Sequence, residues 1–109
     1  MKLLTKELEK KIPPLYSQEN VKDPMVVAKF FFPAGSATWW ITEGSWVESN
    51  KEKHYLMFGL CMLFTPQEAE LGYMNLTELQ TLKVNGLGVE RDMYWEPVPL
   101  SKVKERLGI

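Results

Sequence analysis

The chain has 109 residues, and its 13 Lys and Arg against 14 Asp and Glu leave a formal net charge of −1. A chain of this length can bury one hydrophobic core but not two, so residues 1–109 are predicted to form a single domain. The near balance of charge argues against a protein that grips nucleic-acid phosphates, which needs a basic stripe. The same balance argues against a strongly acidic mimic of DNA.

No segment is typical of secretion or of a membrane span. Charged residues appear within the first seven positions, which leaves no apolar region of a signal peptide. The longest apolar run, Tyr55–Phe64, is about half the length of a spanning helix. Cys61 is the only cysteine and has no partner for an internal disulfide. We therefore expect a cytoplasmic protein.

The predicted elements begin with a helix at the N-terminus. Leu4, Leu8 and Ile12 recur every four residues, and the positions between them are mostly charged. The pair Pro13-Pro14 ends this helix, because proline disfavours helical geometry in the residue before it and lacks an N–H donor.

Two strands are predicted next, joined as a hairpin. Over Met25–Phe32 the even-numbered positions are all apolar, which indicates a strand with one buried face. Pro33–Ser36 has the composition of a turn, and a second strand follows at Thr38–Glu43. Gly44–Lys53 is polar and is predicted to be a connection.

The run Tyr55–Phe64 is apolar on both alternating faces. Such a strand is normally central in its sheet and covered on both sides. A buried helix is the alternative, although Gly59 and the aromatic residues favour a strand.

Four elements are predicted in the C-terminal half. A short strand at Glu70–Met74 leads into a helix that Asn75 can cap and Asn85-Gly86 can end. A strand at Arg91–Glu96 follows, and then a last helix that Ser101 can cap. The whole pattern predicts an α+β fold, with a small, mainly antiparallel sheet and two or three short helices packed against it.

Short motifs spread along nearly the whole chain are similar to those of a known family. They are Lys29-Phe30-Phe31-Phe32-Pro33, Thr38-Trp39-Trp40, Thr42-Glu43-Gly44, Phe58-Gly59-Leu60, Glu70-Leu71-Gly72-Tyr73, Glu78-Leu79 and Glu90-Arg91-Asp92. In order and spacing the chain resembles domain-of-unknown-function family 2958, short bacterial proteins often encoded on phages, plasmids and integrative elements. The resemblance implies a mobile-element setting and carries over no catalytic residue.

The residue types needed for common cofactor sites are scarce. His54 is the only histidine, which excludes a zinc site with two imidazoles from one chain. If His54 and Cys61 share one extended strand, they lie roughly 23 Å apart on opposite faces, which argues against a nucleophilic pair. Gly86-Leu87-Gly88 is only a fragment of a dinucleotide-binding fingerprint. We expect no cofactor and no metal ion.

Four carboxylates are candidates for a shared site. Glu43, Glu70, Glu90 and Asp92 each lie near the end of a predicted strand, and Arg91 could bridge them with its bidentate donors. If these strand ends meet at one rim, the cluster could act as a hydrolytic carboxylate pair or hold a hard cation. The favoured interpretation is a surface ion-pair network that fixes the strand ends and adds little stability.

Trp39 and Trp40 form the other candidate, because neighbours on a strand face opposite sides of the sheet. An exposed Trp40 beside Thr38 and Thr42 would suit a protein interface, where Trp contributes strongly to binding energy. Stacking of nucleic-acid bases is disfavoured, since few basic residues surround it. The alternative places Trp40 beneath a helix.

We therefore expect a non-enzymatic accessory protein of a mobile genetic element that binds a host or element-encoded protein. Modulation of a host defence or transfer system is the concrete form of this hypothesis, which depends on the setting implied by the family. The alternative is a small enzyme or cation-binding protein that uses the carboxylate rim. Neither hypothesis predicts the oligomeric state.

Overall fold

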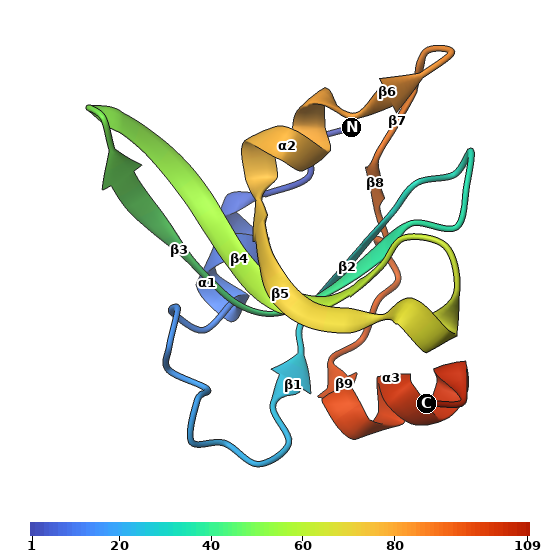
Figure 1. The fold of residues 1–109 in the computed structure, drawn as a ribbon. Helices are drawn as coiled ribbons and strands as arrows, with labels where there is room; N and C mark the ends of the chain where they lie inside the picture. The colour runs from blue at the N-terminus through green and yellow to red at the C-terminus, as the bar shows by residue number, and fades with distance from the viewer.

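A computed structural model describes residues 1–109, and a five-stranded antiparallel sheet is its central feature (Figure 1). The strands follow the order β5-β4-β3-β2-β8 across the sheet. Their bounds are β2 (Ala28–Phe31), β3 (Thr38–Ser49), β4 (Glu52–Met62), β5 (Glu70–Asn75) and β8 (Glu90–Arg91). The predicted α+β fold is confirmed.

Smaller elements surround this sheet. Two further ladders join β1 (Met25–Val26) to β9 (Val98–Pro99) and β6 (Lys83–Val84) to β7 (Leu87–Gly88). The helices are α1 (Lys6–Lys11), α2 (Leu76–Thr81) and α3 (Leu100–Leu107), with a single 3₁₀ turn at Pro66–Glu68. None of the helices has the length and apolar character needed to span a membrane.

The sheet buries side chains on both of its faces. The larger cluster has 13 buried residues, and among them Trp39 and Met57 from the sheet pack with Leu76 and Leu79 of α2. The smaller cluster lies on the opposite face, beneath α3, and has 5 buried residues. They are Val26, Trp40, Leu60, Leu100 and Val103.

The central strand predicted at Tyr55–Phe64 is confirmed as β4, which is hydrogen-bonded to β3 on one side and β5 on the other. Its alternation explains why both faces are apolar: Tyr55 and Met57 enter the larger cluster, and Leu60 enters the smaller one. Phe58 is only half-buried, since it faces a cavity that is described below.

The predicted polar connection at Gly44–Lys53 is wrong. β3 continues to Ser49 and pairs with β4 along its whole length. Asn50 and Lys51 make the turn with φ of 53° and 65°, the left-handed pair that a two-residue hairpin requires. The end of this hairpin projects from the body of the protein (Figure 1). Its residues are exposed to solvent, which explains why they are polar.

Two other predicted strands are shorter than expected. Met25–Phe32 is divided at Val27, because β1 pairs with β9 while β2 pairs with β3. The strand predicted at Arg91–Glu96 is wrong beyond Arg91. There the side chain of Asp92 accepts the N–H of Tyr94 at 3.0 Å and turns the chain out of the sheet.

The predicted start of the second helix is confirmed, but its predicted end and the predicted cap of the last helix are wrong. Asn75 does cap α2, since its side chain accepts the N–H of Thr77 at 2.9 Å. That helix ends at Thr81, and Asn85-Gly86 instead makes the left-handed turn between β6 and β7. Ser101 is not the cap of α3; the carboxylate of Asp23 accepts its N–H and hydroxyl at 3.0 and 2.6 Å. These two bonds lower the pKa of Asp23.

Candidate functional site

The candidate site begins with a bulge in β3. The pairing of β3 with β4 shifts between Ile41 and Glu43, so Thr42 is an extra residue in this strand. Because side chains alternate along a strand, one extra residue moves every later side chain to the other face. Glu43 therefore lies opposite Phe58, on the face of the sheet that also carries Trp40.

The carboxylate of Glu43 fastens the loop after α1 onto the sheet. Glu43 is buried, with 4% of its surface exposed. Its two oxygens accept the backbone N–H groups of Tyr16 at 2.9 Å and Gln18 at 2.8 Å. The neighbouring Gly44 N–H donates to the carbonyl of Pro13 at 2.9 Å. The Leu15 N–H also donates to the Ser45 hydroxyl at 2.9 Å, so four hydrogen bonds hold the segment from 13 to 18 on β3.

This attachment places the ring of Tyr16 against the sheet. Tyr16 has φ of 70°, a left-handed conformation that is rare for a bulky residue and costs energy. Its ring centroid lies 6.5 Å from that of Tyr73, whose ring packs edge-on against Phe58 at 4.9 Å. A strained backbone held by a buried carboxylate therefore completes an aromatic cluster.

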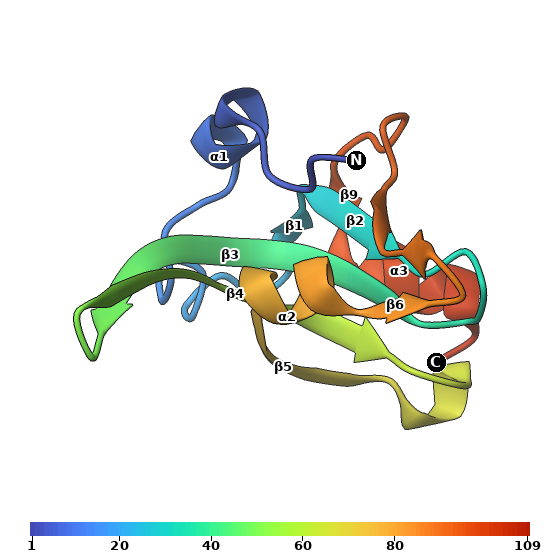
Figure 2. The same ribbon diagram turned by 90° about the horizontal axis from the view of Figure 1, so that it is seen from above.

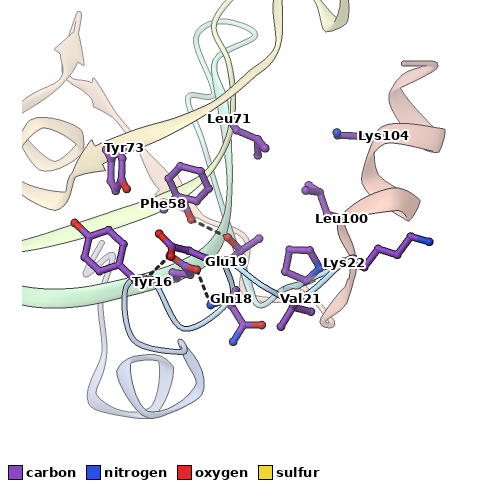
Figure 3. Close-up of a pocket in the computed structure, with 13 residues that line it drawn as sticks. Tyr16, Gln18, Glu19, Val21, Lys22, Phe58, Leu71, Tyr73, Leu100 and Lys104 are labelled. Carbon is purple, nitrogen blue, oxygen red and sulfur yellow. Dashed lines mark hydrogen bonds between the residues drawn. The ribbon is translucent and has the colours of Figure 1, made fainter.

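The aromatic cluster forms one end of a cavity of about 370 Å³, which we call the tyrosine cleft (Figure 3). Tyr16, Phe58 and Tyr73 line this end, and Lys22 and Lys104 line the opposite end, beside Leu100. Tyr16 and Tyr73 remain 57% and 55% exposed, so their rings are accessible to a ligand.

The two ends of the cleft differ in charge. Loss of hydration raises the pKa of Tyr73, with further contributions from the neighbouring Tyr16 and from the carboxylates of Glu19 and Glu43. The carboxylates of Glu19 and Glu43 thus lie near Tyr73, whereas the ammonium groups of Lys22 and Lys104 lie at the opposite end. A ligand that spans the cleft meets both signs of charge.

The binding site expected around Trp40 is not on the surface. Trp40 is 5% exposed and packs beneath α3 against Val103, and Trp39 is equally buried on the other face. Thr38 and Thr42 are buried as well. Of the two alternatives for Trp40, the structure shows the one beneath a helix, because α3 returns from the far end of the chain to cover that part of the sheet.

The carboxylate rim does not form either. Glu70 lies on β5 at one edge of the sheet, Glu90 lies on β8 at the other edge, and Glu43 lies on β3 between them. No three His, Cys, Asp or Glu side chains gather closely enough to hold a metal ion. The strand order thus separates the residues that the sequence pattern suggested would converge.

Arg91 does not bridge carboxylates. Its guanidinium Nη1 donates to the hydroxyl of Thr5 at 3.2 Å, and its buried Nε has no partner. Asp92 instead faces Lys29, with 3.9 Å between the charged atoms. The predicted ion-pair network of Glu43, Glu70, Glu90, Arg91 and Asp92 is therefore also wrong.

Cys61 and His54 lie on the same strand, β4, as the sequence suggested. Burial raises the pKa of the Cys61 thiol, and the charge of Glu68 raises it further. A raised pKa leaves less thiolate, which is the reactive form. His54 lies 3.7 Å from Glu52 near the end of the projecting hairpin.

The comparison with known families matches residues 3–105 to the one described as "Protein of unknown function (DUF2958)". The chain belongs to this DUF2958 family. No curated protein and no solved structure matches it. All the residues of this DUF2958 chain that line the tyrosine cleft fall within the matched range.

Sequence reasoning missed Tyr16, Phe58 and Tyr73 as site residues. Tyr16 lies in a polar segment with no periodic pattern, so nothing local indicates its position. A signal did exist on β5, where Leu71 and Tyr73 place two large apolar side chains on one face of a short strand. Both remain about half exposed in this DUF2958 structure.

Proposed function

We propose that this DUF2958 protein is a protein-binding domain and that the tyrosine cleft is its binding surface. The observation that carries the proposal is the pair Tyr16 and Tyr73, half exposed and fixed at the mouth of a cavity of about 370 Å³. Tyrosine is enriched among residues that dominate binding energy, because it offers a large rigid ring with a polar end.

The role of Glu43 supports binding over catalysis. Each carboxylate oxygen already accepts a backbone N–H, from Tyr16 on one side and Gln18 on the other. A carboxylate engaged in this way stabilises a loop and presents its residues. In this proposal Glu43 keeps the recognition surface in one conformation, which reduces the conformational entropy that is lost when a partner binds.

The setting implied by the family supports a particular kind of partner. Genes carried by phages, plasmids and integrative elements often act on the cell that receives them, so the partner in this proposal is a host or element-encoded protein in the cytoplasm. Modulation of a host defence or transfer system is the corresponding biological role.

The proposal is tested with two cleft variants, Tyr16→Ala and Tyr73→Ala, and one matched control, Tyr94→Ala. Tyr94 is 90% exposed and lies outside the cleft, so its replacement removes the same side chain without touching the site. Affinity-tagged proteins are expressed in the native host, and captured proteins are quantified by mass spectrometry.

A specific partner should be captured by the wild-type protein and by the Tyr94→Ala control. Each cleft variant should weaken its capture by about 30-fold, the effect of losing a residue that contributes about 2 kcal/mol to binding. Equal capture by wild-type and cleft variants would show that the partner binds elsewhere on the molecule.

A further inference from the structure

The two edges of the sheet differ in how well they are protected. β8 has only two residues, and the Sδ atom of Met1 accepts the N–H of Arg91 at 3.1 Å there. β5 has six residues in unbroken register with β4 and contains neither proline nor lysine. Natural proteins usually protect an edge strand with such residues or with a bulge. The outer side of β5 is thus a free pairing edge (Figure 2).

We propose that a second copy of this chain pairs with β5 in an antiparallel arrangement, about a two-fold axis at Gly72. The two five-stranded sheets then become one continuous sheet, with both tyrosine clefts on the same side. This proposal concerns self-association. Tyr73 belongs both to the cleft and to the paired strand, so the binding of the cleft is tested separately at Tyr16.

The faces of β5 determine the register of such a pair. Residues directly opposite each other in an antiparallel pair point to the same face. A two-fold axis perpendicular to the sheet keeps the cleft faces together, and with this axis at Gly72 Leu71 lies opposite Tyr73 of the second copy. Gly72 then lies opposite its own equivalent, at the axis.

This register covers the exposed side chains of β5. Leu71 is 48% exposed and Tyr73 is 55% exposed, and both lie on the same face of the strand. Across the axis they form two aliphatic–aromatic pairs, a favourable cross-strand combination. The dimer therefore removes apolar surface that the single chain leaves in water.

Gly72 is the second observation. A Cβ atom at this position would have no neighbour within 4 Å, so the fold of the single chain does not require glycine there. Glycine inside a strand weakens it, and its presence often marks the close approach of another backbone. At the axis of the proposed dimer two glycines allow that approach.

Cysteine substitution tests this register directly, in a Cys61→Ser background that removes the native thiol. Cα atoms of directly opposed residues lie about 4.5 to 5.5 Å apart, which is within disulfide range. Gly72→Cys should therefore oxidise to a covalent dimer. Leu71→Cys alone and Tyr73→Cys alone place their thiols roughly 8 Å apart at Cα and should not crosslink. A mixture of these two should give the mixed dimer.

Sedimentation measures the association of the uncrosslinked protein. The mass should rise with concentration from the 12.6 kDa of one chain toward twice that value. Tyr73→Lys places a charge in the paired strand and should hold the protein at the mass of one chain, while the control Tyr94→Lys should associate like the wild type.

Three results would overturn the proposal. One is a single-chain mass at every concentration together with no Gly72→Cys dimer. Another is equal crosslinking at all three positions, which indicates random collision. The third is a wild type that stays single while Tyr73→Lys abolishes partner capture, because β5 would then pair with that partner. Tyr16→Ala tests the cleft separately, since Tyr16 lies outside the paired strand.

Discussion

Replacement of Glu43 by alanine tests whether one buried carboxylate maintains the cleft. The change removes two charge-assisted hydrogen bonds, to Tyr16 and Gln18, each of which contributes about 1.5 to 3 kcal/mol. Three effects offset this loss. The released N–H groups regain water, the cost of burying the carboxylate disappears, and the strained backbone of Tyr16 relaxes, which returns about 1 kcal/mol. We expect a net loss of about 2 kcal/mol in the free energy of unfolding.

Glu43→Gln separates the effect of losing hydrogen bonds from the effect of losing side-chain volume. The glutamine oxygen can still accept one N–H, but its NH₂ group meets the second N–H donor. This variant should lose about 1 to 2 kcal/mol, although its shape is nearly unchanged. Glu48→Gln is the matched control, because Glu48 is exposed on the same strand, and it should stay within about 0.5 kcal/mol of wild type.

Denaturant unfolding measures the stabilities, and hydrogen exchange locates the effect. The amides of Tyr16 and Gln18 should exchange faster in Glu43→Ala, while amides in β4 change only by the global loss of stability. A variant with wild-type stability and unchanged protection of these two amides would refute the assigned role of Glu43.

Three further predictions concern the fold. Burial, reinforced by the charge of Glu9, raises the pKa of Tyr55 from 10.0 to about 12. The unfolded chain ionises first, so stability is complete below pH 10 and falls as the pH rises toward 12; unfolding curves of Tyr55→Phe should show a smaller fall. Lys51→Gly should raise the free energy of unfolding by about 0.5 to 1 kcal/mol, since Lys51 has φ of 65°. Phe30→Ala should cost about 3 to 5 kcal/mol in denaturant unfolding and Phe58→Ala about 1 to 2, because only Phe30 is fully buried; the reverse order would contradict the packing.

The parts of the fold that could be predicted are those where burial repeats with a regular period. Tyr55–Phe64 is apolar on both faces, and it forms most of β4, which has neighbouring strands on both sides and a hydrophobic cluster on each face. The same reasoning failed at Gly44–Lys53, because residues 48–53 at the end of the projecting hairpin are exposed on both faces. Hydrophobic periodicity reports burial, and a strand that buries little leaves no such signal.

The candidate site was hidden for a different reason, which is that its contacts span long stretches of the chain. Glu43 bonds to the loop 25 and 27 residues before it, and α3, more than 50 residues after it, supplies the basic end of the cleft. Short sequence patterns do not report contacts between distant segments. The expectation that the carboxylates meet at one rim depended only on the position of each residue within its own strand. The strand order then placed Glu70 and Glu90 at opposite edges.

The bulge at Thr42 places Glu43 on a face of the sheet that strict alternation along β3 would not give it. In regular register Glu43 would share the face of Trp39 and Ile41 and point into the larger cluster, where an unpaired carboxylate is very costly. The extra residue turns Glu43 to the opposite face, where two backbone N–H groups donate hydrogen bonds to its carboxylate. The polar side chain thus selects the irregular register, and the irregular register in turn positions the loop that carries Tyr16. A carboxylate in a strand that is otherwise apolar is therefore evidence for a bulge and for a distant donor, before either can be located.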